Sequence, residues 1–293
     1  MRERISYFAV ILLIMLLIPA GVILLFSDGQ KLETEKEPNL EDYLAGIVYS
    51  QIPDTDYPLE AVKAQVVLAR SNLICGLLDG SISEEDWKQE ASDLRSEMKS
   101  RKFNSSYRRI QTAVSGTKDE VLSFQGRVCR GIFHRVSAGY TRSGCDVLEG
   151  SEYEYITGVE SVVDQECEDY LTGHYFTPDF LKKEFLNFGI HISFSDGDEI
   201  TVKTRDEAGY VSTVQVGDTL CTGEEVRQML HLPSASFTVE NQGEKVRFLC
   251  RGQGHGMGMS QYGAGRMAKE GSTYRDILSY YFPEAEILVM ESE

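Results

Sequence analysis

Apolar residues recur at helical spacing from Leu40 onward. Over residues 40–51 they follow the pattern i, i+3, i+4, i+7 and i+8, which predicts an amphipathic helix that ends before Pro53. A second helix is expected to begin near Pro58, a residue suited to a first helical turn, and to end at Gly80. Its buried stripe is formed by Val62, Val66, Ala69, Leu73 and Leu77. Residues 82–102 are charged and helix-prone, which is typical of a solvated helix or an insertion.

The pattern changes to short β-branched and aromatic runs later in the chain. The expected strands lie at residues 121–136, 155–163, 200–202, 211–216, 237–239 and 246–250, the last four forming two hairpins. A short helix is expected at residues 223–230, and Thr273 with Asp276 has the spacing of a capping box before a C-terminal helix. Helices first, strands next and a helical end favour an α+β fold over a wound parallel sheet.

The N-terminus carries a long apolar run. Residues 7–26 contain no charge, and at 1.5 Å per residue they span roughly 30 Å, the thickness of the hydrocarbon layer of a bilayer. Arg2 and Arg4 precede this run and acidic residues follow it, so we expect a cytoplasmic N-terminus and an extracytoplasmic remainder. A long, cleaved signal peptide is the alternative, and it also places the rest of the chain outside.

The expected organisation follows from these patterns. It comprises a cytoplasmic tip with a transmembrane anchor (residues 1–27), a polar stalk (28–39) and one folded domain (40–285). Within that domain we expect helical residues 40–105, β-rich residues 106–250, and a glycine-rich motif with C-terminal helices at residues 251–285.

The charge of the chain limits its partners. Its formal net charge is −17, with 46 Asp and Glu residues against 29 Lys and Arg residues. Such an acidic surface repels phosphate backbones, so we expect no nucleic-acid partner. The six cysteines include no CxxC pair and do not indicate a dense disulfide scaffold in a chain of 293 residues.

The most unusual segment, residues 251–265, reads RGQGHGMGMSQYGAG, with alternating glycine on both sides of His255. Alternating glycine removes side chains from one face of an extended strand, so that a ligand or another backbone can approach closely. A lone imidazole on such a surface is suited to hydrogen bonding or proton transfer. The alternative is a glycine-rich loop with a packed histidine. The segment lacks the GKS/T ending of a phosphate-binding loop.

This segment resembles the signature of the stage II sporulation protein D family, also called the SpoIID/LytB or amidase-enhancer domain. Residues 252–264 match the family block GxGHGxGMSQxGA nearly residue for residue. Further stretches resemble other family motifs in family order, at residues 44–48, 58–70, 133–141 and 274–282. Together they cover most of residues 40–285, and the resemblance implies a mixed helical and antiparallel-β ectodomain of SpoIID type.

The resemblance implies an action on peptidoglycan. The sporulation members are lytic transglycosylases that cut glycan strands stripped of stem peptides, beside a membrane-anchored amidase. Such an enzyme needs one carboxylic acid to protonate the leaving glycosidic oxygen, because the C6 hydroxyl of the sugar closes an anhydro ring without a second carboxylate. In the family this acid is the glutamate of an EMP motif. Gln51 stands at that position here, before Ile52 and Pro53.

An amide at this position changes the expected chemistry. Gln51 can form hydrogen bonds as a carboxylic acid does but supplies no acidic proton, and loss of general acid catalysis typically lowers a rate about 10²–10⁴-fold. We therefore expect a site that binds glycan and cleaves it poorly or not at all. Four alternatives stay open: Glu60 or Glu41 replaces the acid, the extra residues 53–56 shift the alignment, a partner supplies the acid, or Gln51 only ends its helix.

The same resemblance indicates which residues contact the glycan. Gln51 and His255 are the expected catalytic positions. The expected substrate-binding residues are Lys63, Arg70, Ser137, Gly139, Thr141, Gly254, Gly256, Ser260 and Gln261. Lys63 and Arg70 lie two helical turns apart and so point the same way, where they would bind carboxylate or hydroxyl groups of N-acetylmuramic acid. Solvated helix cations and a tight turn at residues 137–141 are the alternative interpretations.

A metal site is a weaker expectation. His134, Cys145 and Cys167, with His174, offer side chains that zinc accepts, but their spacing is long and no paired-ligand motif is present. Buried cysteines and a histidine in a turn are the alternative. We expect no cofactor.

Three hypotheses follow for a membrane-anchored, extracytoplasmic protein of the cell wall. The chain binds denuded glycan strands in sporulation or wall remodelling, it is an active lytic transglycosylase with another acid, or it is a non-enzymatic amidase enhancer. The expected partners are glycan strands, a membrane-anchored wall amidase, and the lipid bilayer through residues 7–26.

Overall fold

The computed structural model describes residues 40–52, 57–83, 85, 105–148, 150–194 and 199–290. The expected anchor, the stalk and most of the charged stretch 82–102 lie outside the described residues, and the anchor stays a prediction. Within the described part, the helix Leu59–Leu78 is long and apolar enough to cross a membrane. However, 67% of its apolar window is buried inside the fold, so we describe it as a core helix.

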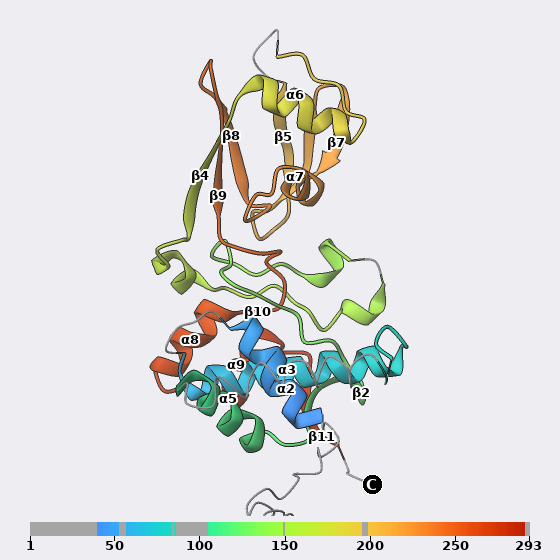
Figure 1. Ribbon diagram of the computed structural model, residues 1–293, viewed down its shortest axis with the longest axis vertical. Helices are drawn as coiled ribbons and strands as arrows, with labels where there is room; N and C mark the ends of the chain where they lie inside the picture. The colour runs from blue at the N-terminus through green and yellow to red at the C-terminus, as the bar shows by residue number, and fades with distance from the viewer. Residues whose placement is uncertain are drawn as a thin grey trace, which may run out of the picture. The chain divides into compact units, whose positions relative to one another are not determined.

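The first hydrophobic core lies between three helices, α2 (Leu40–Gln51), α3 (Leu59–Leu78) and α5 (Ser105–Gly116), which Figure 1 draws in blue and green. Their shared interior contains Leu44, Val48, Val62, Val66, Leu73, Ile110 and Val114. The proline before α3, Pro58, occupies its N-cap position, where the missing N–H leaves no intrahelical bond unmade.

The second core lies against a different face of α3, which contributes Ala64, Val67 and Leu68. It is closed by α8 (Gln261–Lys269), α9 (Tyr274–Tyr281) and an antiparallel sheet in the order β11 (Glu286–Val289), β1 (Glu120–Phe124) and β2 (Arg127–Val128). Because two faces of α3 are covered, most of its residues are buried, which explains why its sequence is apolar nearly all round.

The third core is built mainly from antiparallel strands. One sheet has the order β4 (Leu171–Phe176), β9 (Val246–Arg251) and β8 (Phe237–Asn241), and the other has β5 (Ile200–Arg205), β6 (Val211–Val216) and β7 (Thr219–Thr222). Two helices, α6 (Pro178–Asn187) and α7 (Gly223–Met229), lie beside these strands in Figure 1. They pack into this core through Leu181, Phe185 and Val226.

The segments that connect the second and third cores hold the sequence motifs. They include the short parallel pair β3 (Phe133–His134) and β10 (Met259–Ser260), and the 3₁₀ helices η1 (Gly144–Asp146), η2 (Ser151–Tyr153) and η3 (Val162–Glu166). The backbone of Val136 exchanges two hydrogen bonds with Gln253, at 3.1 and 2.7 Å. The motif at residues 133–141 therefore lies directly against the glycine-rich segment.

The α+β class is confirmed, as are both hairpins, the helix α7 and the capping box of α9. Two element predictions are wrong. Residues 155–163 form no strand but a single bridge and the start of η3, because the tight turns there leave no partner strand beside them. The helix α5 lies in the part expected to be β-rich, since Ile110, Ala113 and Val114 have helical spacing and pack on α3.

The end of the domain also differs from the prediction. Strand β11, at Glu286–Val289, lies beyond the expected boundary at residue 285 and pairs with β1. All six cysteines lie among the described residues, and all are free thiols.

The glycine-rich segment is not the extended strand that its alternation suggests. Its alternating glycines all have positive φ, with values of 75° at Gly252, 105° at Gly254, 81° at Gly256 and 66° at Gly258. A Cβ on Gly258 would overlap the carbonyl group of Ile132, and one on Gly256 would overlap the ring of Tyr210. The close approach that the sequence predicts is therefore present, but to protein groups and through left-handed backbone.

Candidate active site

Gln51 is the last residue of α2, and its side chain joins a chain of three amides. Gln65 Nε2, on α3, donates to Gln51 Oε1 at 2.9 Å. Gln261 Nε2, at the first position of α8, donates to Gln65 Oε1 at 3.2 Å and to the backbone oxygen of Gln51 at 3.0 Å. Gln65 is only 1% exposed. Gln51 therefore meets the glycine-rich motif through Gln261, not through His255.

A narrow cavity of about 10 Å³ adjoins these amides. It is lined by Ile52, Tyr57, Ala61, Gln65, Met259, Gln261 and Ala264. Its size is about that needed for a single water molecule. Burial raises the pKa of the Tyr57 hydroxyl to about 12, so this wall is a neutral phenol. Near Gln51 the described part of the chain thus presents uncharged hydrogen-bonding groups.

The two glutamates considered as replacement acids lie elsewhere. Glu41 begins α2, about 15 Å along the helix from Gln51, and both of its oxygens accept hydrogen bonds from Arg70. Burial would raise the pKa of Glu60, but hydrogen bonds from Lys63 and from the backbone N–H of Tyr274 outweigh it and lower that pKa. Neither carboxyl group is arranged as a proton donor at Gln51.

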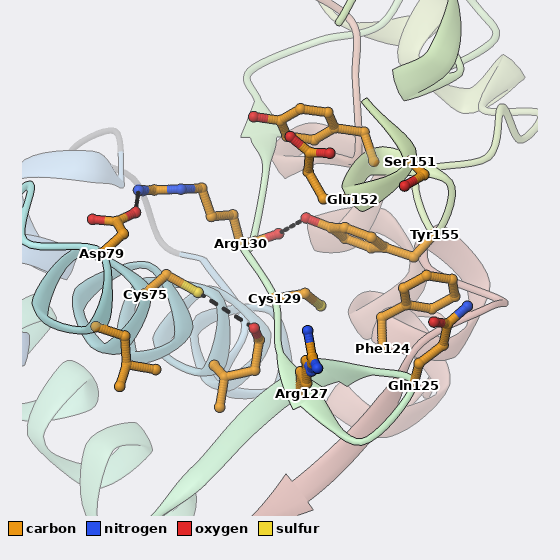
Figure 2. Close-up of a pocket in the computed structure, with 13 residues that line it drawn as sticks. Cys75, Asp79, Phe124, Gln125, Arg127, Cys129, Arg130, Ser151, Glu152 and Tyr155 are labelled. Atoms are coloured by element: carbon orange, nitrogen blue, oxygen red, sulfur yellow. Dashed lines mark hydrogen bonds and ion pairs between the residues drawn. The ribbon is translucent and has the colours of Figure 1, made fainter. Parts of the chain in front are cut away.

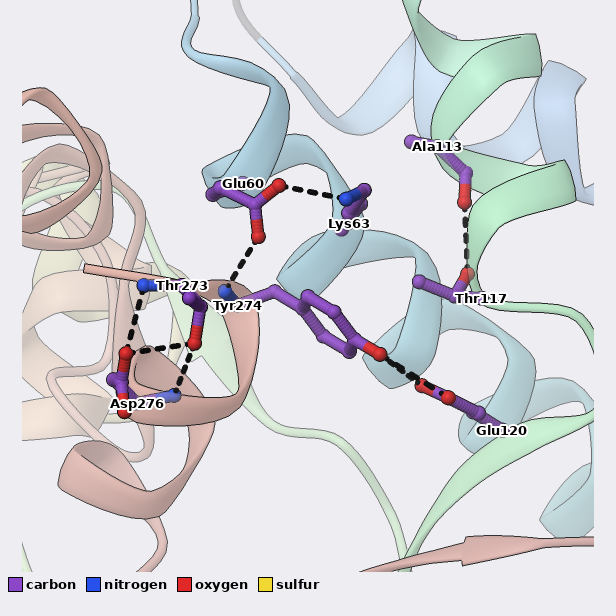
Figure 3. A network of polar contacts seen from close by, with 8 residues as sticks. All are labelled: Glu60, Lys63, Ala113, Thr117, Glu120, Thr273, Tyr274 and Asp276. Atoms are coloured by element: carbon purple, nitrogen blue, oxygen red, sulfur yellow. Dashed lines mark hydrogen bonds and ion pairs between the residues drawn. The ribbon is translucent and has the colours of Figure 1, made fainter. Parts of the chain in front are cut away.

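Lys63 lies on the side of α3 that faces away from the amides, because it is two residues, or about 200°, from Gln65. Figure 3 shows it among α3, α9 and β1. Its Nζ donates to Glu60 Oε1 at 2.7 Å and stands 5.4 Å from the ring centroid of Tyr274, whose hydroxyl donates to Glu120 at 2.9 Å. Lys63 therefore belongs to a network that ties these elements together.

Arg70 points to the same side of α3 as Lys63, as its spacing predicts, but that side is buried here. Arg70 is 1% exposed. Its guanidinium binds both oxygens of Glu41, at 3.0 and 2.8 Å, and donates to the backbone oxygen of Glu120 at 3.0 Å. The guanidinium is thus paired with α2 and β1, and a contact of Arg70 with glycan stays a prediction.

His134 and His255 lie next to each other, with ring centroids 5.9 Å apart and planes at 62°. His134 Nδ1 donates to the carbonyl oxygen of Met257 at 2.9 Å, while the N–H of Met257 donates to His255 Nδ1 at 3.1 Å. Burial lowers the pKa of both imidazoles to about 4. For His255, positive charge on neighbouring groups, foremost His134, lowers the pKa further. At neutral pH, His255 is therefore a neutral imidazole with its proton on Nε2.

A buried carboxylate, that of Asp164, joins the motif at residues 133–141 to the glycine-rich segment. Asp164 accepts hydrogen bonds from the N–H of Ser137 at 2.8 Å and from Ser260 Oγ at 2.8 Å. All three residues have no exposed surface. Burial raises the pKa of Asp164, against the lowering effect of the serine hydrogen bonds. Ser137 and Ser260 are therefore internal hydrogen-bond partners of Asp164, and their expected contact with sugar stays a prediction.

The remaining expected contacts form the turn and its neighbours. Thr141 has no exposed surface, and its Oγ1 accepts from the N–H of Val159 at 2.9 Å. Gly139, with φ of 104°, donates to Ser137 Oγ at 3.1 Å. A Cβ on Gly254 would lie 2.9 Å from the Cβ of His134. These residues shape the motif from inside, as the tight-turn interpretation proposes.

The side chains considered for zinc do not gather. Among the described residues, no group of three or more His, Cys, Asp and Glu side chains could hold a metal ion. Cys145 is exposed, and His174 Nε2 instead interacts with Thr172 Oγ1 at 3.2 Å. His134 Nε2 is buried and has no hydrogen-bond partner among the described residues, but it belongs to no such group of ligands there.

A family model described as stage II sporulation protein matches residues 28–124. The stage II sporulation protein D of Bacillus subtilis (strain 168) is 31% identical over 263 residues, which cover 85% of this chain and 74% of that protein. The chain belongs to the stage II sporulation protein D family.

Other relatives agree with this assignment. The stage II sporulation protein D of Bacillus amyloliquefaciens is 28% identical to this SpoIID-family chain over 267 residues, with 86% of the chain and 75% of the relative covered. The amidase enhancer of Bacillus subtilis (strain 168) is 44% identical over 50 residues, which are 17% of this chain and 7% of that protein. The likeness to the amidase enhancer is thus local.

Sequence reasoning missed two residues of this SpoIID-family site, Gln65 and Asp164. Gln65 interrupts an apolar run of α3. A polar side chain in such a run is buried and needs a hydrogen-bond partner, which is a signal that the sequence alone offers. Asp164 follows two valines in a stretch read as β-structure, and nothing local indicates that it reaches Ser137 and Ser260.

Proposed function

We propose that this chain is a membrane-anchored, peptidoglycan-acting protein that binds denuded glycan strands in sporulation or wall remodelling and does not cleave them efficiently. The observation that carries the proposal is the amide network of Gln51, Gln65 and Gln261. It brings the end of α2 to the glycine-rich motif of the family, as a shared site requires. It also contains no ionisable group at the position of the expected acid.

The chemistry of the site supports binding over cleavage. Protonation of a leaving glycosidic oxygen needs an acidic proton, and a carboxamide has none to give. His255 is neutral at pH 7, Glu41 is paired with Arg70, and Glu60 has a lowered pKa. Gln51 is partly exposed at the end of α2, where its amide can form hydrogen bonds with the hydroxyl and amide groups of an amino sugar. The proposed role requires no cofactor.

The proposed site is tested with the full chain, purified in mild detergent and incubated with denuded glycan strands. We expect the native chain to release almost no anhydro-sugar product by mass spectrometry. Gln51→Glu replaces the amide by a carboxyl group that can still accept the hydrogen bond of Gln65, and we expect it to raise product formation by at least about 10²-fold.

The controls separate the proposed site from other acids. Gln51→Ala keeps the pocket without a hydrogen-bonding group and should stay inactive. Glu60→Gln and Glu41→Gln test the two alternative acids in the native background. Robust turnover by the native chain that is lost in Glu60→Gln, or an inactive Gln51→Glu that still folds, would refute the proposal.

A second candidate function is a non-enzymatic amidase enhancer, favoured by the local identity to the amidase enhancer of Bacillus subtilis. This function needs a wall amidase as partner and no sugar site. Sedimentation with purified glycan separates the two candidates. The glycan-binding proposal expects the native chain in the pellet and Gln51→Ala partly released, whereas an enhancer without a sugar site stays in the supernatant.

A further inference from the structure

A second pocket lies at the C-terminal end of α3, away from Gln51. Its volume is about 710 Å³, within the usual range of about 300–1,000 Å³ for small-ligand sites. It is lined by Cys75, Leu78, Asp79, Phe124, Gln125, Arg127, Val128, Cys129, Arg130, Ser151, Glu152, Tyr153 and Tyr155. Its residues on α3 begin ten positions, or about 15 Å, beyond Gln65, so it is separate from the amide network.

The frame of this pocket is held by hydrogen bonds between its walls. Asn72 on α3 exchanges two hydrogen bonds of 2.9 Å with the backbone of Gly131. The Tyr155 hydroxyl donates to the backbone oxygen of Arg130, and the Arg130 guanidinium donates to Asp79. The segment at residues 129–132, which follows β2, is therefore fixed between α3 and Tyr155, and the pocket is present before any ligand binds.

Two opposite charges at the pocket have no ion-pair partner among the described residues. Arg130 and Asp79 neutralise each other. Arg127 and Glu152 are exposed, and neither forms a side-chain hydrogen bond or an ion pair with another described residue. In the view of Figure 2 they lie on opposite sides of Cys129. The pocket thus offers one cationic and one anionic group to an incoming molecule.

Two aromatic side chains and a cysteine contribute apolar surface to the pocket. Phe124 and Tyr155 pack together with ring centroids 5.6 Å apart. Cys129 lies beside them, and burial raises the pKa of its thiol to about 12, with Cys75 adding to that rise. Its sulfur is therefore neutral at physiological pH. Such a floor suits an aliphatic or aromatic stem between two charged ends.

We propose that this pocket binds a short peptide that carries both a free ammonium and a free carboxylate, the first at Glu152 and the second at Arg127. A neutral sugar would leave both charges without partners. A nucleotide or a polyanionic strand would satisfy Arg127 but meet Glu152 and the acidic surface of the chain. Stem peptides of peptidoglycan have the required chemistry, and this identification of the source rests on the proposed wall function.

The probe is the tripeptide L-alanyl-γ-D-glutamyl-meso-diaminopimelate, titrated into the full chain in mild detergent by calorimetry. We expect saturable binding to the native chain. Arg127→Gln and Glu152→Gln should each weaken it by about tenfold or more, because each removes a charged hydrogen-bond partner. Lys203→Gln and Glu207→Gln, matched changes of exposed charges on the β5–β6 hairpin, should leave the affinity unchanged.

Two ligand controls complete the test. The peptide with acetylated amines should bind at least about tenfold more weakly, since it lacks the ammonium groups. Chitotetraose, a neutral sugar chain, should not compete with the peptide at this pocket. Equal affinity of the native chain and both charge variants, equal binding of acetylated and free peptide, or absence of binding would overturn the inference.

Failure here is distinguishable from failure of the glycan-binding proposal. Glycan sedimentation of the same preparations reports on the site at Gln51. If Arg127→Gln and Glu152→Gln sediment with glycan as the native chain does but no variant binds the peptide, only the peptide site is refuted. If peptide binding persists while the native chain stays in the supernatant, only the glycan-binding proposal is refuted.

Discussion

The imidazoles of His134 and His255 are held as a complementary neutral pair. Met257 fixes both rings, since its carbonyl oxygen accepts from His134 and its N–H donates to His255. His134 is 4% exposed and has an unpaired, buried Nε2. A proton added to either ring would place a charge in this interior beside Arg142, whose Nη1 lies 3.4 Å from the backbone oxygen of His255. Protonation of either imidazole therefore destabilises the folded state.

The first prediction concerns acid stability. Both folded pKa values, about 4, lie below the ordinary value of about 6.5, so on acidification the unfolded chain binds protons first. The stability that the two neutral imidazoles contribute to the fold is thus complete above pH 6.5 and is lost as the pH falls towards 4. We expect His134→Asn, which keeps a donor for Met257 but does not titrate, to reduce this loss by about 3 kcal/mol.

Urea unfolding at pH 7 and pH 4 measures the difference, with His191→Asn at an exposed position as the matched control. An unchanged pH dependence in His134→Asn would show that another group causes the acid sensitivity.

At the residue scale, the sequence predicts which side chains share a direction but not what that direction faces. Lys63 and Arg70 do point the same way on α3, yet one lies over Tyr274 and the other inside the fold against Glu41. Helical periodicity relates residues to one another, while the burial of a face depends on elements that pack later, here α5, β1 and α9. The contact between Gln51 and the glycine-rich motif was predictable from the family motifs alone.

At the element scale, α8 begins inside the glycine-rich segment, at Gln261. Ser260 is its N-cap, and Ser260 Oγ accepts from the N–H of Gly263 at 3.1 Å while donating to Asp164 at 2.8 Å. The same hydroxyl therefore starts the helix and satisfies a buried carboxylate. By contrast, Thr222 caps α7 in a capping box at the surface.

The second prediction compares these two caps. Thr222→Ala should lower the free energy of unfolding by about 1 kcal/mol, the ordinary value of a lost N-cap. Ser260→Ala should lower it by about 2–4 kcal/mol, because an oxygen of Asp164 also loses its donor in a buried site. Denaturant unfolding of both variants checks this. Equal losses would mean that water or another donor replaces the hydroxyl at Asp164.

Elements with a clear local pattern were predictable, and elements that depend on distant partners were not. Both hairpins, α7 and α9 carry their turn and capping residues within a few positions. Strand β11 has only four residues, EILV, too few for a clear local pattern, and it forms by pairing with β1. Residues 155–163 have β-type composition but no neighbouring strand to pair with along their length.

At the scale of the whole described domain, the glycine-rich segment links the third core to the second. It leaves β9 at Arg251, passes the motif at residues 133–141 and enters β10 at Met259. Along this path its glycines replace side chains by direct backbone contact with Ile132, Val136 and Tyr210. The connection between these two cores therefore depends on glycines at which a Cβ would overlap neighbouring atoms.

The third prediction separates this contact from backbone strain. Gly258→Ala adds a Cβ that overlaps the Ile132 carbonyl at φ of 66°, whereas Gly271→Ala adds one in open space at φ of 101°. Gly271→Ala should cost about 1 kcal/mol of stability through strain alone. Gly258→Ala should cost at least about 3 kcal/mol, because β3 and β10 must also separate. Thermal unfolding of both variants tests this, and equal losses would contradict it.

The pairing of β1 with β11 has a consequence for how the protein is made. Ser123 and Glu286 are hydrogen-bonded across 163 residues of chain. The helices α8 and α9, which cover α3, also come much later in the sequence than α3 does. During synthesis, α3 emerges long before the segments that shield its apolar surface. The nascent domain must therefore remain unfinished until β11 leaves the ribosome, and a chain cut short before α8 would expose α3 to aggregation.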